Sequence, residues 1–265
     1  MEMSKQLEPA GKERIVLIGA GNVATHLGVA LQQARWEIAQ VYSRTEASAS
    51  ELANRLQVPF VTSIAEVCTD ADVYIVAVKD DALPVLIPEL VKGRNGMFVH
   101  TAGSVPMKVW EGYALNYGVL YPMQTFSKQK PVDFSKVPFF LEGDGGETLA
   151  ILRKLACSLS GKVYNATSEQ RMALHMAAVF ACNFTNHMYA LSAHLLEKNG
   201  LPFDAMLPLI DETARKVHEL APKAAQTGPA IRKDMDVMNK HLDMLSGEPE
   251  LKELYEKISK SIQEL

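Results

Sequence analysis

The sequence predicts an α/β fold, a doubly wound and mostly parallel sheet, followed by an all-α C-terminal domain. Three observations support this fold class. Short apolar segments alternate with helical patterns in the first part of the chain, a glycine-rich turn follows the first segment, and strand patterns disappear after Ser168. We therefore expect two domains, residues 1–165 and residues 166–265.

The composition is that of an ordinary globular protein, with 48% hydrophobic and 22% charged residues. The net charge is −4 and neither part of the chain carries a basic surplus, so we expect no nucleic-acid partner. No apolar run has the length of a membrane span, and the first residues lack the hydrophobic core of a signal peptide. Three widely spaced cysteines predict reduced thiols rather than disulfides. We expect a cytoplasmic protein.

The first strand and turn predict a dinucleotide site. Residues 14–18 form a short β-branched run, typical of a buried parallel strand, and a helical pattern begins shortly after it. The G-x-G-x-x-A motif between them has the order of strand, turn and helix that a dinucleotide site requires. Gly19 permits the turn, and Gly21 lets a pyrophosphate approach the backbone. The alternative is a purely structural turn. The expected cofactor contacts here are Gly19, Ala20, Gly21, Asn22 and Val23.

The second strand, residues 38–42, is followed by Ser43-Arg44-Thr45. An NAD site normally has an acidic residue at this strand end to bind the ribose 2′-hydroxyl. Two hydroxyls and an arginine suit a 2′-phosphate instead, because they supply donors and positive charge. We therefore expect NADP as the cofactor; the alternative for Arg44 is a solvated turn residue.

Further apolar segments complete a sheet of about eight strands. They are residues 58–61, 71–78, 97–101, 118–121, 138–141 and 162–164, with a helix near 147–159. Ligands lie at the carboxyl ends of such strands. We therefore expect further cofactor contacts from Val78, Lys79, His100 and Thr101, and substrate contacts from Ser104 and Gln124. The alternatives are a structural hydrogen-bonding role for His100 and a solvated side chain for Lys79. For Asp80 and Asp81 we favour a capping role at the next helix, which has Pro84 in its first turn.

A helix of unusual length is predicted from Ser168 to Lys198, with Thr167 or Ser168 as its cap. His175 and Asn183 share one stripe of this helix at 100° per residue. We expect His175 to exchange a proton and Asn183 to orient a substrate oxygen. The alternative is a satisfied core or interface network. His187 and His194 share another face, but no carboxylate-rich motif accompanies them, so we expect no metal site.

Three more helices are expected near residues 203–220, after a Thr227-Gly228-Pro229 bend as far as Leu245, and over 251–265. Thr227 and Arg232 flank the bend and are candidate substrate contacts. The alternative for this segment is an ordinary loop with a helix cap and a surface ion pair.

Several motifs together resemble a known group over nearly the whole chain. They are the glycine turn, Ser43-Arg44-Thr45, Lys79-Asp80-Asp81, residues 100–104 and 121–126, His175 with Asn183, and the segment from Thr227 to Asp234. The chain resembles bacterial Rossmann-like NADP oxidoreductases with an uncharacterised helical C-terminal domain. It is more distantly similar to pyrroline-5-carboxylate reductase, deazaflavin-dependent NADP reductases and the 6-phosphogluconate dehydrogenase superfamily. The resemblance implies a homodimer formed through the C-terminal helices.

The sequence departs from these relatives in two respects. Many relatives have a histidine where Tyr121 stands, and the second departure concerns the 6-phosphogluconate dehydrogenase superfamily. Its hydroxyacid dehydrogenases carry a catalytic lysine on the first long C-terminal helix, whereas no lysine occurs here between Lys162 and Lys198. We expect an NADP(H)-dependent oxidoreductase that transfers a hydride to or from a small carbonyl, imine or alcohol. Two alternatives are a non-catalytic NADP-binding sensor or scaffold and a deazaflavin-linked NADP reductase.

Overall fold

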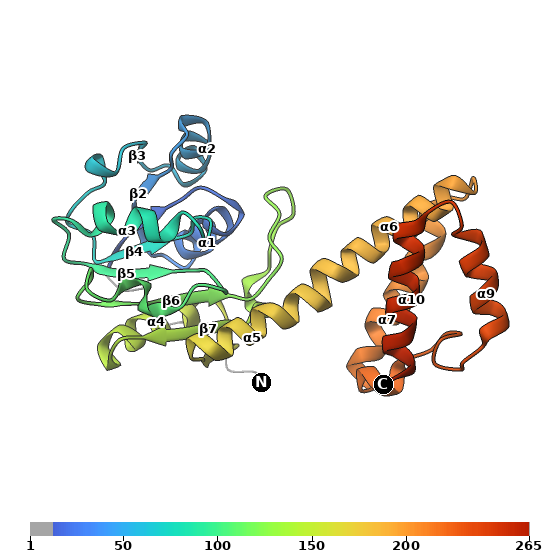
Figure 1. The fold of residues 1–265 in the computed structure, drawn as a ribbon. Helices are drawn as coiled ribbons and strands as arrows, with labels where there is room; N and C mark the ends of the chain where they lie inside the picture. Colours follow the sequence, from blue (N-terminus) through green and yellow to red (C-terminus); the bar gives the residue numbers. More distant parts are fainter. Residues whose placement is uncertain (1–12, 265) are drawn as a thin grey trace, which may run out of the picture. The chain divides into compact units, whose positions relative to one another are not determined.

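The computed structural model describes residues 13–264, which divide into two compact units, one ending at Asn186 and one beginning at His187. The first unit contains the sheet, and the second is built from helices (Figure 1). The fold class predicted from the sequence is confirmed.

Within the described residues, eight strands form one sheet in the order β3-β2-β1-β4-β5-β6-β7-β8. Neighbouring strands are parallel, except that β6 and β7 are antiparallel. The direction of winding reverses between β1 and β4, which is where such sheets bind ligands. The strands are β1 (Arg14–Ile18), β2 (Glu37–Tyr42), β3 (Phe60–Val61), β4 (Val73–Val76), β5 (Met97–His100), β6 (Tyr117–Pro122), β7 (Phe139–Gly143) and β8 (Val163–Asn165).

Helices cover both faces of the sheet, and the side chains of β1 alternate between these two faces. Ile15 and Leu17 pack with α1, α2 and α4 on one face, and Val16 and Ile18 pack with α3 and Trp110 on the other. The connecting helices are α1 (Asn22–Gln33), α2 (Glu46–Leu56), α3 (Leu83–Val91) and α4 (Gly146–Leu159), with the short helices η1 (Ile64–Glu66), η2 (Met107–Trp110) and η3 (Phe134–Lys136).

The long helix predicted from Ser168 to Lys198 is present but is not uniform. It consists of α5 (Ser168–Ala178), a π-helical segment η4 (Val179–Phe184) and α6 (Thr185–Lys198). Thr167 caps it with a reciprocal pair of bonds: Gln170 N donates to the Thr167 hydroxyl, and Thr167 N donates to Gln170 Oε1. The helix ends before Gly200, whose φ of 69° lies in the left-handed region.

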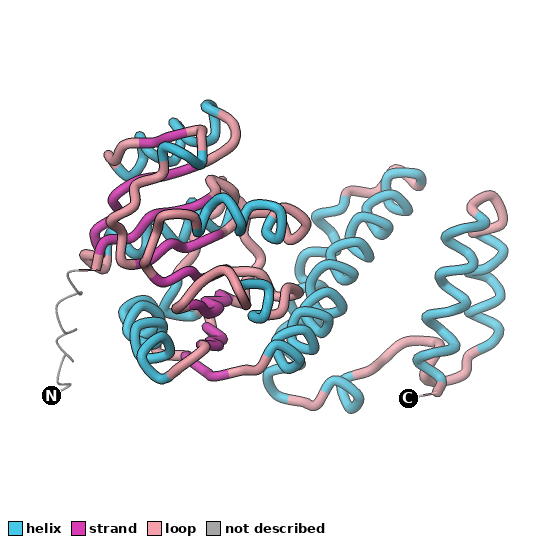
Figure 2. The backbone as a smooth tube through the Cα atoms, turned by 60° about the vertical axis from the view of Figure 1, so that its left-hand side comes forward, coloured by secondary structure: helices cyan, strands magenta, loops and turns pink. Residues whose placement is uncertain are grey.

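The second unit continues with five more helices among the described residues (Figure 2). These are η5 (Phe203–Met206), α7 (Leu207–Glu219), α8 (Pro222–Ala225), α9 (Met235–Met244) and α10 (Pro249–Gln263). Few of its described side chains are buried, namely Ala230, Met238, Leu245 and Ser259.

Two local expectations are wrong. Asp80 and Asp81 do not cap α3, because its N-cap is Ala82 without a side-chain bond; the Asp80 carboxylate instead accepts from the Ser104 hydroxyl. The helix after the Gly228 bend begins only at Met235, because the preceding residues form turns. Asp234 is its N-cap and accepts from Val237 N at 3.3 Å.

Candidate functional site

The turn after β1 requires glycine at its first position. Gly19 has a φ of 110°, and a Cβ there would lie 2.3 Å from the carbonyl oxygen of Ala77. Gly21 has no atom within 4 Å of the position that a Cβ would occupy, so space is open beside the backbone. Gly21 also precedes α1 without offering a side-chain cap, which leaves the first amides of that helix available to a ligand.

A cavity of about 840 Å³ lies against this turn in the first unit. Eight of the predicted cofactor residues line it, namely Gly19, Ala20, Gly21, Ser43, Arg44, Thr45, Val78 and Lys79. Thr45 is the N-cap of α2 but makes no capping bond with its side chain, so its hydroxyl is available. Arg44 is exposed and belongs to none of the ion pairs found among residues 13–264.

The other four predicted cofactor residues are not among those that line this cavity. The Asn22 side-chain amide donates to the Phe126 carbonyl at 2.8 Å, and Val23 is half-buried. His100 is fully buried, and Thr101 is 8% exposed.

The buried His100 is held neutral. Burial, with a smaller contribution from the Arg171 charge, lowers the pKa of His100 to about 3. Its Nδ1 accepts from Ala102 N at 3.2 Å, so the hydrogen of the neutral ring is on Nε2. Among the described residues, that Nε2 has no hydrogen-bond partner. His100 is therefore a core residue whose protonation would cost stability.

A second cluster, around Gly103, contains His175. Tyr121 Oη lies 3.5 Å from His175 Nδ1, and the two rings meet edge to face. A Cβ on Gly103 would lie 2.7 Å from His175 Nδ1 and 2.9 Å from Tyr121 Cζ, so a larger residue would displace the pair. Burial raises the pKa of Tyr121, which keeps its phenol protonated. The neighbouring Ser104 hydroxyl donates to Asp80.

Arg171 fixes the loop after β5, which carries Gly103 and Ser104 of this cluster. It is 1% exposed and forms an ion pair with Glu142 of β7. Its guanidinium also donates to the Ala102 carbonyl at 3.2 Å and to the Val105 carbonyl at 2.5 Å. The Ser168 hydroxyl donates to Glu142 and accepts from Met107 N at 2.9 Å. The start of α5 is thus joined to β7 and to the loop after β5.

The remaining candidate substrate residues belong to separate segments of the chain. Gln124 is exposed, and its Oε1 accepts from Thr125 N at 2.8 Å. Asn183 is exposed and lies in the π-helical segment. Thr227 and Arg232 are both exposed and belong to the second unit.

Sequence reasoning assigned no site role to three residues of the site region: Tyr121, Arg171 and Lys128. The first two act through partners more than 20 residues away in the chain, and Lys128 lines the cavity at the glycine turn while its ammonium pairs with Glu51. For Lys128, position after β6 was an available clue, because loops after parallel strands lie on the ligand side of the sheet.

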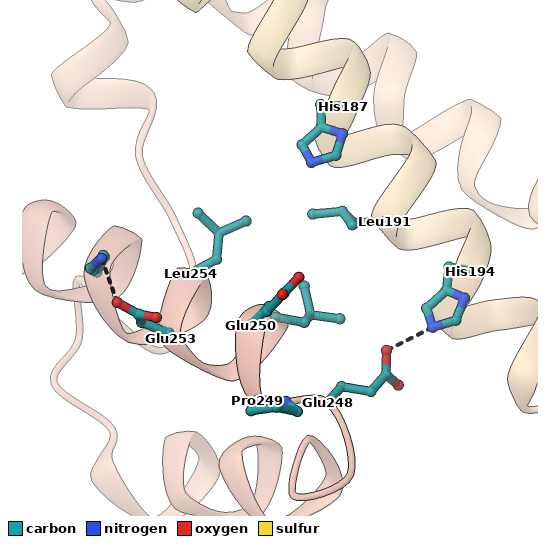
Figure 3. A pocket seen from close by; sticks show the side chains of 10 residues that line it. His187, Leu191, His194, Glu248, Pro249, Glu250, Glu253 and Leu254 are labelled. Carbon is teal, nitrogen blue, oxygen red and sulfur yellow. Dashed lines mark hydrogen bonds and ion pairs between the residues drawn. The ribbon is translucent and has the colours of Figure 1, made fainter.

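The second unit has its own cavity, of about 770 Å³, between α6 and α10 (Figure 3). His194 Nε2 lies 2.7 Å from Glu248 Oε2, and Lys198 Nζ lies 2.7 Å from Glu248 Oε1. The hydrogen bond from Lys198, and next that from His194, lowers the pKa of the Glu248 carboxyl. Across residues 13–264 no group of three or more His, Cys, Asp or Glu side chains is placed to hold a metal ion. In the same range, none of the helices is both long and apolar enough for a membrane span.

Two family models match the chain. One, described as "NADP oxidoreductase coenzyme F420-dependent", matches residues 14–99, and the other, a domain of unknown function (DUF2520), matches residues 137–262. A search among curated proteins finds no match.

Solved structures resemble the chain over nearly its full length. The putative NADP oxidoreductase of Bacteroides fragilis is 58% identical, with a TM-score of 0.92 over 96% of this chain and 98% of that chain. A Thermotoga maritima protein is 23% identical, with a TM-score of 0.78 over 94% and 98% of the two chains. An imine reductase of Myxococcus stipitatus in complex with NADP+ is 16% identical, with a TM-score of 0.65 over 95% and 92%. The last two likenesses concern the fold alone.

Proposed function

This chain belongs to the family of the Bacteroides fragilis NADP oxidoreductase, and on that premise we propose that it transfers a hydride between NADP(H) and a small carbonyl, imine or alcohol. One observation carries the proposal. The glycine turn, the Ser43-Arg44-Thr45 triplet and Lys79 line a single cavity at the carboxyl ends of β1, β2 and β4. Glycine-rich backbone and positive charge are the chemistry that a phosphorylated dinucleotide requires.

The residues at the glycine turn fit a pyrophosphate. The space beside Gly21 admits a phosphate close to the backbone, and the uncapped start of α1 supplies amide hydrogens and a partial positive charge. We propose contacts to the backbone of Ala20, Asn22 and Val23 at this helix start. For His100 and Thr101 we propose contacts through main-chain atoms, since the His100 imidazole is buried.

The end of β2 fits the additional phosphate of NADP. Arg44 has no carboxylate competitor among the described residues, and the Thr45 hydroxyl makes no capping bond. We propose that these two residues and Ser43 bind the ribose 2′-phosphate, and that Val78 and Lys79 contact the cofactor from β4.

The chain's own acid–base chemistry would come from His175. When bound, the nicotinamide supplies or accepts the hydride. We propose that His175 delivers or removes the proton at the substrate oxygen or nitrogen. The Tyr121 phenol can donate to Nδ1 of the neutral ring, which keeps the hydrogen on Nε2. Asn183, Ser104, Gln124, Thr227 and Arg232 remain proposed substrate contacts.

Calorimetric titration with NADPH and NADH tests the cofactor. We expect NADPH to bind more tightly, and Arg44→Ala to weaken NADPH about tenfold or more while NADH changes little, because one charge-assisted contact is worth about 1.4 kcal/mol or more. Arg35→Ala, which removes another exposed arginine of the same unit, is the control. Absence of binding of both nucleotides at millimolar concentration would refute the proposal.

A second candidate is favoured by the description of the first family model, which names coenzyme F420, a deazaflavin. In that case hydride would pass between two cofactors and no small substrate would be needed. Mixing reduced F420 with NADP+ and following absorbance distinguishes the two. Oxidation of F420 by NADP+ favours this candidate, whereas NADPH oxidation only with small carbonyls or imines favours the first.

We also propose a division of labour and an assembly. Residues 1–165 would bind the nucleotide, and residues 166–265 would contribute to substrate binding and form a homodimer through their helices. Support for the dimer comes from apolar side chains that are exposed on these helices. Those at least half exposed in the second unit include Leu209, Val217, Leu220, Met235 and Met244.

A further inference from the structure

The loop between β6 and β7, residues 123–138, whose path can be followed in Figure 1, is hydrogen-bonded to α1, the helix that starts at the glycine turn. Asn22 Nδ2 donates to the Phe126 carbonyl at 2.8 Å, and His26 Nε2 donates to the Ser127 carbonyl at 2.9 Å. The His26 and Phe126 rings are stacked with centroids 5.8 Å apart. The loop is therefore held over the start of α1 at its residues 126 and 127.

The next residue reaches a second helix. Lys128 Nζ lies 2.7 Å from Glu51 Oε2, and Glu51 is on α2, whose N-cap is Thr45. The loop is thus bound to α1 through residues 126 and 127 and to α2 through Lys128, which lines the same cavity as Gly21, Arg44 and Thr45. Its side chain is 26% exposed, whereas that of Glu51 is 61% exposed. The lysine faces the cavity, and its carboxylate partner is largely in solvent.

Lys128 can exchange Glu51 for another anion at little cost in free energy. An ion pair with a solvated carboxylate is weak, because water competes for both charges. A phosphate monoester carries up to two negative charges and three acceptor oxygens, so it competes well for an ammonium. In the cavity that Arg44 and Lys79 also line, a further cation that can change partners raises affinity selectively for a ligand with a ribose phosphate.

We propose that Lys128 is a specificity-determining residue, whose ammonium binds the ribose phosphate of NADP(H) and whose release from Glu51 accompanies cofactor binding. The proposal rests on the proposed function, since it names a further residue of the same cofactor site. It differs from a mere tether, in which the ion pair would only hold the loop to α2.

The two roles predict opposite effects of Glu51→Gln. If Glu51 competes with the ligand, the substitution frees Lys128 and tightens NADPH binding about two- to fivefold, while Lys128→Gln weakens it about tenfold. NADH, which lacks the phosphate, should bind both variants like the wild type. If the pair is only a tether, both substitutions loosen the loop and weaken both nucleotides.

Calorimetry of the full chain with NADPH, NADH, 2′,5′-ADP and 5′-AMP measures these differences. Lys130→Gln, two residues along the same loop and exposed, is the matched control and should change none of the affinities. Equal effects on NADPH and NADH, or no effect of Lys128→Gln, would overturn the inference while leaving the proposed function intact. A wild type that binds neither dinucleotide would overturn both.

Discussion

At the scale of single residues, two histidines near the candidate site lie in opposite environments. His100 is fully buried and neutral, whereas His175 is partly exposed beside the Tyr121 phenol. The sequence alone made both histidines candidates for a ligand site, His100 at the end of a strand and His175 on a helix. Only burial separates a structural imidazole from one that can exchange protons with a ligand.

The buried imidazole makes stability sensitive to acid. Because the folded pKa of His100 is about 3 and the unfolded value about 6.5, only the unfolded chain gains this proton between those two pH values. The contribution of His100 is therefore fully present above pH of about 6.5, and it falls by up to about 1.4 kcal/mol per pH unit below that. Urea unfolding at several pH values should show a flatter acid limb for His100→Gln.

The control for that measurement is His218→Gln, which removes an exposed histidine of α7. It should leave the acid limb as steep as in the wild type. Equal acid sensitivity of wild type and His100→Gln would contradict the buried neutral state of His100.

The Tyr121 hydroxyl should set the tautomer of His175. With Nδ1 accepting from Tyr121, the ring nitrogens of neutral His175 should give the ¹⁵N shifts of the Nε2–H form. Tyr121→Phe removes only this hydroxyl and should shift the ring toward a mixture of tautomers. Tyr164→Phe is the matched control, because Tyr164 stacks on the same Phe140 from an exposed position. An unchanged His175 spectrum in Tyr121→Phe would refute the role.

At the scale of elements, Arg171 joins α5, β7 and the loop after β5. Removing it in Arg171→Leu leaves the Glu142 carboxylate with an unpaired charge beside the core. We expect a loss of about 3–5 kcal/mol in the free energy of unfolding. Adding Glu142→Gln should recover part of this loss, because no charge is then stranded.

Urea unfolding of the two single variants and the double variant measures this coupling. Glu253→Gln, which breaks an exposed pair with Lys257 on α10, should leave stability nearly unchanged. A double variant whose loss equals the sum of the single losses would show that Arg171 and Glu142 act independently.

The elements that were predictable are those set by local pattern. The alternation of Ile15 and Leu17 with Val16 and Ile18 places both faces of β1 in a core, and this reads directly as a parallel strand. The glycine turn was also predictable, because its G-x-G-x-x-A motif is local; the contact that excludes a side chain at Gly19, with the Ala77 carbonyl oxygen after β4, is not part of that local pattern.

Other features depend on contacts that no local pattern contains. The π-helical segment at Val179–Phe184 changes the angular step along the helix, so a stripe drawn at 100° per residue from His175 does not extend unchanged to Asn183. The Thr185 hydroxyl donates to the Phe180 carbonyl, five residues earlier, which fits this wider turn. Lys128 likewise meets Glu51 only through the path of the folded loop.

At the scale of the whole molecule, the two units differ in how many apolar side chains each buries by itself. The first has apolar clusters on both faces of the sheet, whereas the described part of the second buries few side chains. Helices with so little buried apolar surface gain little stability by themselves, since burial is the main source of folding free energy. A second copy of the chain is the occupant that we propose for the exposed apolar helix surface.

This assembly can be tested on α7. Val217 is 51% exposed on this helix, and Leu220, which is 50% exposed, follows the helix as its C-cap. Analytical ultracentrifugation of the wild type should show a dimer at micromolar concentration, and Val217→Glu should raise its dissociation constant about tenfold or more, because a charge would be buried in the interface. Glu219→Lys changes a charge on the opposite side of α7 and should leave the dimer intact. A wild type that sediments as a monomer at about 100 μM, a concentration at which stable homodimers are fully associated, would refute the assembly.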